Sequence, residues 1–234
     1  MVGMTTAARE TAAGLAEFNA YYDDVHAGEV LAANPGFGPP RRYELDGEPD
    51  SATPRWLALY PIATGEHVAA YLDRQRDPGR NARTYTPGPP SWNDASFVWR
   101  AVWRLAAASA PPPGPVTALL VAGVDPPADA TDAEMAEFTD FYDEGHVPDI
   151  LEYGGYRSFA RYEKIAHLPA ALDGYPRFCS MYTTDVPPAD LDGRAALAEA
   201  GKNGRLSVGP PIWQRRTTWW RLWFTPIQAA VTER

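Results

Sequence analysis

Hydrophobic and polar positions in the second half of the chain predict a strand followed by an amphipathic helix. Residues 115–124, PVTALLVAGV, are an apolar run with β-branched residues, bounded by proline and glycine, which is typical of a strand. The next segment places apolar and aromatic residues three and four positions apart on one helical face: Met135, Phe138, Tyr142 and His146. Thr131 or Asp132 can cap this helix, with Glu134 in its first turn.

The remaining pattern predicts three more strands and a second helix. Residues 155–165 and 176–186 are rich in aromatic and β-branched residues and predict two strands. Residues 188–201 predict a helix that ends at a glycine, and residues 216–224 predict a last strand. The resulting order, β-α-β-β-α-β, is that of a ferredoxin-like module.

The first half of the chain repeats landmarks of the second half in the same order. The matching segments lie at offsets between 117 and 122 residues: Gly3 and Gly123, EF at 17 and 137, YD at 22 and 142, His26 and His146, Tyr43 and Tyr162, PRWLALY and PRFCSMY, GPPSW and GPPIW, and WRL at 103 and 220. We interpret this pattern as a duplicated module, because self-similarity at a fixed period indicates a repeated structural unit.

A proline-rich segment separates the two copies. Residues 108–115, ASAPPPGP, favour an extended connector over a helix or a strand. The predicted domains are therefore a first module at 1–107, a linker at 108–115 and a second module at 116–234. The counterpart of the strand VTALLVA would begin before Met1, so we expect the first strand of the first module to be missing or truncated. An unpaired sheet edge of this kind would favour a homodimer.

Composition narrows the class of partner. The formal net charge of -9 and the pI near 4.9 argue against nucleic acid and anionic membranes as partners. The single cysteine, Cys179, cannot form an intramolecular disulfide or a cysteine-based metal site. The chain shows neither a secretory signal nor an apolar run of the ~20 residues that a membrane span needs. We therefore expect a cytoplasmic protein whose partner is a hydrophobic or aromatic small molecule.

The segment FYDEGHVPDILEYGGY, residues 141–156, resembles the EthD-like branch of the dimeric α+β barrel superfamily. The resemblance implies an α+β fold in which two ferredoxin-like modules pack sheet to sheet, here as an intramolecular dimeric α+β barrel. It also implies enzymes that act on small aromatic or polyketide-like molecules. Related barrels include cofactor-free cyclases, dehydratases and oxygenases, some haem-dependent enzymes and members without an assigned activity.

Two histidines are the main candidates for chemistry. Of the four histidines, His26 and His146 occupy equivalent repeat positions, whereas His67 and His167 have no counterparts and are interpreted as surface residues. Imidazole has a pKa near the working pH, so either member of the pair could act as a general acid or base. The alternative is a polar helix end that is hydrogen-bonded to a backbone carbonyl.

Tyrosine and aspartate accompany both histidines. Tyr22 and Tyr142 lie four residues before the histidines, on the same helical face, where a hydroxyl could orient the imidazole or polarise a carbonyl. Asp23 and Asp143 lie three residues before the histidines and could stabilise the imidazolium. Core packing of the tyrosines and a solvated helix face for the aspartates are the alternatives.

Aromatic residues at equivalent positions predict a binding surface. Trp92 and Trp213 each follow a Gly-Pro-Pro segment, which we interpret as a loop, and could wall the mouth of a pocket for a flat ligand. Tyr60 and Tyr182, on the third predicted strand of each module, are weaker candidates for the same wall.

We expect no cofactor and no metal, because phosphate loops, dinucleotide fingerprints, nucleophile elbows and metal-spaced histidines are missing from the sequence. The preferred hypothesis is a cofactor-independent lyase, cyclase or isomerase of secondary metabolism that uses histidine acid/base chemistry. The alternatives are a cofactor-free or haem-dependent oxygenase and a non-catalytic binding protein. Between the two copies we favour His146, assisted by Tyr142, since Pro148 stiffens the following chain where the first copy has Gly28.

Overall fold

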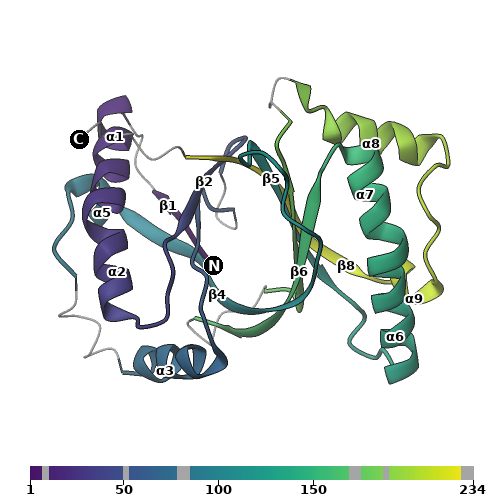
Figure 1. Ribbon diagram of the computed structural model, residues 1–234, viewed down its shortest axis with the longest axis horizontal. Helices are drawn as coiled ribbons and strands as arrows, with labels where there is room; N and C mark the ends of the chain where they lie inside the picture. The colour runs from purple at the N-terminus through teal and green to yellow at the C-terminus, as the bar shows by residue number, and fades with distance from the viewer. Residues whose placement is uncertain (7–10, 50–52, 78–84, 169–174, 187–189, 228–234) are drawn as a thin grey trace. The chain divides into compact units, whose positions relative to one another are not determined.

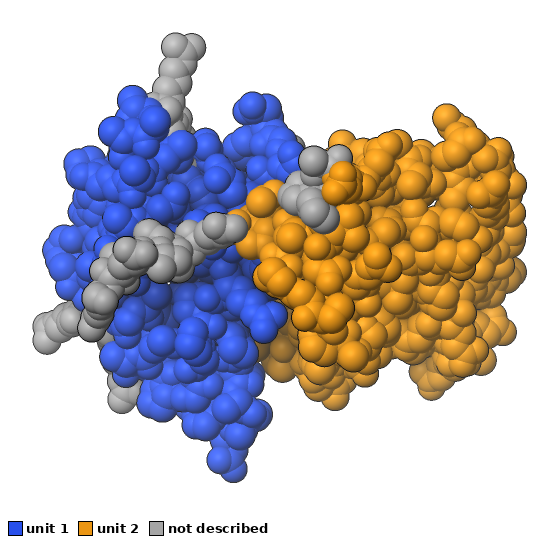
Figure 2. Space-filling model, turned by 45° about the horizontal axis from the view of Figure 1, so that its top comes forward, with its two compact units in different colours: residues 1–100, 227–234 blue, residues 101–226 orange. Residues whose placement is uncertain are grey.

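The fold is described by a computed structural model that covers residues 1–6, 11–49, 53–77, 85–168, 175–186 and 190–227 (Figure 1). The chain divides into two compact units, which Figure 2 shows in different colours. Unit 1 consists of Met1–Arg100 and Ile227–Arg234, and unit 2 consists of Ala101–Pro226. None of the helices in these ranges is long and apolar enough to cross a bilayer.

The first part of the chain contains four strands and several helices. The elements in chain order are β1 (Val2–Thr6), α1 (Ala12–Tyr21), the π-helical turn η1 (Tyr22–His26), α2 (Ala27–Ala33), β2 (Arg41–Leu45), β3 (Trp56–Leu59), α3 (Gly65–Gln75), α5 (Pro90–Asn93) and β4 (Ala95–Ala108). The helices α1, η1 and α2 follow one another without a break. Strand β1 pairs antiparallel with both β3 and β4.

The second part has the same succession of elements. They are β5 (Ala118–Asp125), α6 (Asp132–Phe141), the π-helical turn η2 (Tyr142–His146), α7 (Val147–Gly154), β6 (Ser158–His167), β7 (Phe178–Thr184), α8 (Gly193–Lys202), α9 (Pro211–Gln214) and β8 (Thr217–Pro226). The predicted β-α-β-β-α-β order is confirmed for this part of the chain. The Thr131 hydroxyl caps α6 and the Glu134 carboxylate bonds back to the Thr131 amide, so the predicted helix start is also correct.

The expected fold class is wrong. We expected two ferredoxin-like modules that pack sheet to sheet as an intramolecular dimeric α+β barrel. The strands instead follow one closed hydrogen-bonded order, β1-β3-β2-β8-β5-β7-β6-β4, so they form a single eight-stranded barrel. The 14-residue strand β4 takes part in two pairings, because residues 95–100 pair with β1 and residues 101–108 pair with β6. A strand of that length can satisfy two partners in succession.

The first strand, which we expected to be missing or truncated, is present and shorter than its counterpart β5. Strand β1 pairs over Val2–Met4 with β3 and over Val2–Thr6 with β4. It has five residues, whereas β5 has eight. An open edge at β1 therefore gives no reason to expect a homodimer, and the oligomeric state stays a prediction. The proposed division at 108–115 also stays a prediction; the compact units divide between Arg100 and Ala101.

The strand register corrects one landmark of the proposed repeat. Gly3 pairs with Trp99 and Val2 with Arg100, whereas Gly123 pairs with Trp220 and Ala122 with Arg221. The structural equivalent of the Trp-Arg pair at 220 and 221 is therefore the pair at 99 and 100, and not the WRL segment at 103. Both pairings shift register just after the glycine, which places a β-bulge at the same point of each part.

The core of unit 2 lies between its strands and the helix α6-η2-α7. Its buried members come from β5, α6, η2, α7, β7 and α9: Leu120, Val124, Phe138, Tyr142, Val147, Ile150, Tyr156, Phe178, Tyr182, Ile212 and Trp213. Leu120, Ala122 and Val124 are alternate positions of β5, so their side chains lie on the same face of the strand. The helix-facing side of the sheet is therefore the side of Leu120, Ala122 and Val124.

Candidate functional site

Each candidate histidine is the last residue of a π-helical turn, His26 in η1 and His146 in η2. In η2 the amide of Val147 donates to the carbonyl of Tyr142, five residues back, and in η1 the amide of Ala27 donates to the carbonyl of Tyr22. The single helix that the sequence predicts is thus interrupted, in both parts of the chain, by one wider turn that ends at the histidine. Such turns are rare inside α-helices and occur often at functional sites. The spacing of apolar residues did not reveal this turn.

His146 lies against two aromatic rings. Its imidazole meets the ring of Tyr142 edge-on at a centroid distance of 5.4 Å and the ring of Trp213 at 4.7 Å. Burial, together with the positive charges of Arg216 and Arg221, lowers the pKa of His146 to about 3. The imidazole is therefore neutral at pH 7. In this form it can accept a proton as a base, but it is not an imidazolium that could donate one as an acid.

Tyr142 is fixed by a hydrogen bond that the sequence did not predict. Its ring is fully buried, and its hydroxyl accepts a 2.8 Å hydrogen bond from Ser180 on β7. Burial raises the pKa of Tyr142 to about 12, so the phenol stays protonated. Tyr182 is buried beside it, and its hydroxyl lies near those of Ser180 and Tyr142. Ser180 lies two positions before Tyr182 in the strand segment PRFCSMY. This spacing puts both side chains on the same face of the strand, and it was the one sequence signal that could have identified Ser180.

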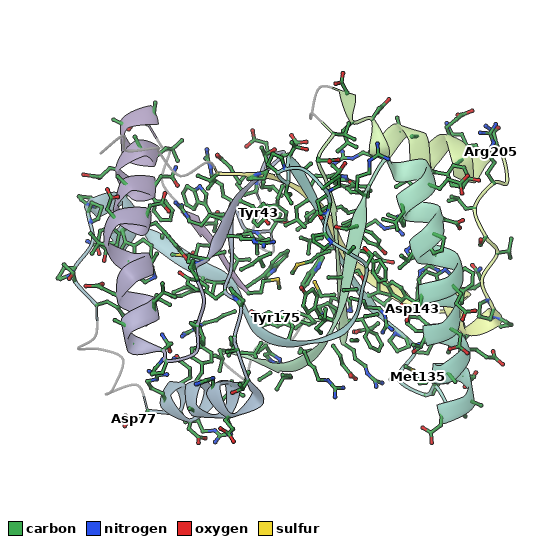
Figure 3. The ribbon with its side chains drawn as sticks, in the orientation of Figure 1. Tyr43, Asp77, Met135, Asp143, Tyr175 and Arg205 are labelled. Carbon is green, nitrogen blue, oxygen red and sulfur yellow. The ribbon has the colours of Figure 1, made fainter. Side chains whose placement is uncertain are left out.

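Asp143 binds an arginine and not the histidine. Both of its carboxylate oxygens accept from Arg161 on β6, at 2.9 Å from Nε and at 2.6 Å from a terminal nitrogen. Figure 3 labels Asp143 on the side of the helix that faces the strands. The Arg161 side chain is only 6% exposed. The pair ties η2 to the sheet, so the expected imidazole-orienting role of Asp143 is replaced by a positioning role for the whole turn.

Trp213 lies on a short helix that begins at the second proline of the Gly-Pro-Pro segment. Helix α9 begins at Pro211, and the indole is 4% exposed. The rings around it come from α6 and η2: Phe138, Phe141, Tyr142 and His146. The Arg216 guanidinium lies 4.3 Å from the ring centroid on the indole face. Trp213 therefore packs against His146 and Arg216, and its role as a wall of a binding pocket stays a prediction.

The equivalent group in unit 1 has different neighbours. His26 lies near the rings of Trp92, Tyr22 and Tyr85, at centroid distances of 4.4, 5.1 and 5.3 Å. Burial lowers the pKa of His26 to about 4, with Glu29 opposing and Arg42 reinforcing the shift. Its Nδ1 atom is buried and makes no hydrogen bond to any described residue.

Tyr22 is held by a different partner from Tyr142, whereas Asp23 is held in the same way as Asp143. The hydroxyls of Tyr22 and Tyr60 share a 2.8 Å hydrogen bond, because Ala58 stands at the β3 position that Ser180 holds on β7. Asp23 pairs with Arg42 at 2.8 Å, as Asp143 pairs with Arg161. The structure thus brings the predicted tyrosine and tryptophan of each copy against its histidine, and pairs the predicted aspartate with an arginine. Arg42 and Arg161 were missed, although each directly precedes a tyrosine that marks the repeat, Tyr43 or Tyr162.

Metal ligands do not gather in the residues that the structure describes. No group of three or more His, Cys, Asp and Glu side chains there is close enough to hold a metal ion. The site is instead built from one imidazole, aromatic rings and arginines.

Comparisons with known proteins give limited information. No protein-family model matches the chain, and no curated protein matches it. Among solved structures, a protein described as a candidate chlorite dismutase is similar, with a TM-score of 0.49 and 10% sequence identity. The alignment covers 97% of this chain and 92% of that one. A likeness this low carries no information on chemistry, and membership of the EthD-like branch stays a prediction.

Proposed function

We propose that the protein is an enzyme that removes a proton from carbon in an enolisable aromatic or polyketide-like small molecule, as the first step of a cyclisation, dehydration or rearrangement. The observation that carries this proposal is His146: a neutral imidazole on a π-helical turn, packed against two aromatic rings and within electrostatic reach of two guanidinium groups. A neutral imidazole is the form in which histidine accepts protons.

In the proposed step His146 takes the proton from a carbon next to the substrate carbonyl. The C–H bond breaks, and its electron pair forms the carbon–carbon double bond of an enolate while the carbonyl electron pair moves to oxygen. The imidazole becomes an imidazolium. Negative charge on the substrate offsets the two guanidinium charges that lower the pKa of His146, so the base becomes stronger as the reaction proceeds.

Tyr142 acts as a positioning residue in this proposal. Its hydroxyl is held by Ser180 and its ring edge contacts the imidazole, so it limits the orientations that His146 can adopt. Positioning of this kind matters because a misplacement of about 1 Å can lower a rate by on the order of a hundredfold. Asp143 and Arg161 contribute by holding η2 against the sheet.

Hydrogen–deuterium exchange tests the proposal without knowledge of the natural substrate. Phenylpyruvate, an aromatic molecule with an enolisable carbon, is incubated in D₂O with the protein, and loss of its C3 proton signal is followed by NMR. We expect exchange above the buffer rate and a fall of at least about a hundredfold in the catalysed part for His146→Ala, the typical contribution of a general base. Catalysed exchange that survives in a folded His146→Ala variant contradicts the proposal.

A non-catalytic binding protein is the second candidate. The low pKa of His146 favours it, since a group with a pKa of about 3 is a weak base before any ligand arrives. The two candidates differ in one result: a binding protein binds aromatic molecules without catalysing exchange. The haem-dependent alternative is tested separately by the absorbance spectrum of the purified protein, in which bound haem gives an intense band near the ultraviolet edge of the visible range.

A further inference from the structure

We propose that Arg216 and Arg221 of unit 2 form a subsite for a carboxylate, so that the molecule which reaches His146 is a small organic anion. The subsite names the substrate class of the proposed enzyme and in that respect rests on the proposed function. Its existence as a binding site does not depend on catalysis and can be tested alone.

The β-bulge in β8 places Arg221 on the helix-facing side of the sheet. Arg221 pairs with Ala122 and Thr218 pairs with Val124, so Trp219 is the additional residue in β8. Arg221 and Thr218 therefore share the helix-facing side, although three positions apart in a regular strand would place them on opposite sides. Arg216 precedes β8 and lies on the indole of Trp213, which packs against His146. The bulge thus brings Arg221 to the side where His146 lies.

The sheet register locates Arg221 relative to the rest of the site. Across neighbouring strands the aligned residues are Arg221 on β8, Ala122 on β5, Ser180 on β7 and Arg161 on β6. Ser180 and Arg161 are the residues that bind Tyr142 and Asp143 of η2. Arg221 is thus at one end of this row of four residues, and Arg161, which binds the π-helical turn, is at the other. Ala122, between Arg221 and Ser180, adds only a methyl group to this row.

Charge in this region is unbalanced. Arg216 is half-buried, donates a 2.7 Å hydrogen bond to the carbonyl of Trp213 and lies on its indole face. Arg221 is exposed. Among the described residues, neither arginine makes an ion pair with a carboxylate. Burial and the charge of Arg221 lower the pKa of Arg216, the sign expected for two cations that face each other without an anion.

A carboxylate supplies what this arrangement lacks. Guanidinium groups bind carboxylates through paired N–H donors, and such charge-assisted bonds are stronger than neutral ones. An anion beside Arg216 and Arg221 also removes the repulsion between them. It would raise the pKa of His146 toward its ordinary value, because the same two charges lower it. Binding of the anion and activation of the base are thereby linked.

Unit 1 does not have the same pair. The register of β4 against β1 gives Ala95 as the counterpart of Arg216 and Arg100 as the counterpart of Arg221. Arg100 already has partners on α3, since it donates to the Tyr71 hydroxyl at 3.2 Å and to the Gln75 side-chain oxygen at 2.5 Å. The histidine of unit 1 has the carboxylate of Glu29 among its neighbours. We therefore place the anion subsite in unit 2 only.

Benzoate binding tests the subsite. Binding of sodium benzoate is measured by calorimetry and by the imidazole NMR signals of His146, with uncharged benzamide and inorganic phosphate as comparison probes. We expect benzoate to bind at least tenfold more tightly than benzamide or phosphate and to shift the His146 signals. Arg221→Gln, at an exposed position, should weaken benzoate at least tenfold. Arg205→Gln, which removes an equal charge beyond α8 and away from Asp143 (Figure 3), should leave it within twofold.

Each result has a defined meaning. Benzoate that fails to bind, or that binds Arg221→Gln as well as the unaltered protein, overturns the subsite, and phosphate that binds as tightly as benzoate overturns its assignment to carboxylates. Arg221-dependent benzoate binding without catalysed exchange of phenylpyruvate supports the subsite and removes the enzyme proposal. Exchange that depends on His146 and is unaffected by Arg221→Gln supports the enzyme and overturns the assignment of its substrate to this subsite.

Discussion

At the scale of single residues, the two histidines differ from the acid/base pair that the sequence suggested. Spacing on a helical face correctly placed each of them beside its tyrosine. Burial then gives His146 a pKa of about 3 and His26 a pKa of about 4, which leaves both rings neutral at pH 7. They can accept protons under those conditions, and they are not general acids until a ligand changes their surroundings.

Stability should fall as pH decreases, because of these histidines. Above an unfolded-state pKa of about 6.5 the imidazole is neutral in both states. Below it the unfolded chain binds a proton that folded His146 refuses until about pH 3, so acid favours unfolding. At pH 5 this lowers the unfolding free energy by at most about 2 kcal/mol for His146. Urea unfolding at pH 7 and pH 5 should show a smaller difference for His146→Gln; an unchanged difference contradicts the burial described above.

The ion pair of Asp143 and Arg161 should contribute measurably to stability. Asp143→Ala leaves a guanidinium that is 6% exposed without its carboxylate, and we expect a loss of about 1–3 kcal/mol, below the largest values for buried pairs because Asp143 is 31% exposed. The matched control is Asp129→Ala, which breaks an exposed pair with Arg215 and should change stability by less than about 1 kcal/mol. Chemical denaturation compares them. Equal losses in the two variants would show that Arg161 does not need its partner.

At the scale of elements, local sequence accounts for the helices better than for their irregularities. Thr131, one of the two predicted caps, caps α6, and Glu134 in the first turn completes a capping box. The π-helical turns and the bulge at Trp219 were not predicted, because each adds one residue whose place is decided by packing against another element. The partners of Asp143 and Tyr142 come from β6 and β7. Identifying such contacts requires the strand register, which hydrophobic alternation alone does not supply.

Glycine at the bulge is required by close packing. A Cβ atom on Gly123 would lie 2.5 Å from the Trp220 ring and 2.8 Å from Pro176. We therefore expect Gly123→Ala to lower the unfolding free energy by about 1–3 kcal/mol, the usual effect of overpacking. Gly28→Ala in helix α2 is the control: its Cβ would meet nothing within 4 Å, so the better helix former should raise stability by up to about 1 kcal/mol. In thermal unfolding, the midpoint temperature should fall for Gly123→Ala and rise for Gly28→Ala.

At the scale of the whole molecule, sequence repetition and structure agree on the elements and differ on how strands assemble. The order of elements in each part follows from hydrophobic pattern and turn residues. The double pairing of β4, with β1 and then with β6, could not be inferred from either copy taken alone. Strand β1 illustrates the same limit, because its five residues correspond to the end of β5 and form a strand through their pairing with β3 and β4.

The repeated site invites a comparison of its two copies. In unit 1 the charges that act on His26 are those of Glu29 and Arg42, and Arg42 is already paired with Asp23. Unit 2 combines His146 with Arg216 and Arg221 and with a tyrosine that Ser180 fixes. We infer that the second copy carries the chemistry and that the first has a structural or secondary role. The stiffening effect of Pro148 in the first turn of α7 points the same way.

The exchange of phenylpyruvate by two single variants tests this central claim most directly. Catalysed loss of the C3 proton in D₂O is measured for His146→Ala and for His26→Ala, with circular dichroism to confirm that both are folded. We predict a loss of at least about a hundredfold for His146→Ala and a change of less than about threefold for His26→Ala. Activity that is abolished by His26→Ala and retained by His146→Ala would contradict the assignment of the active site to unit 2.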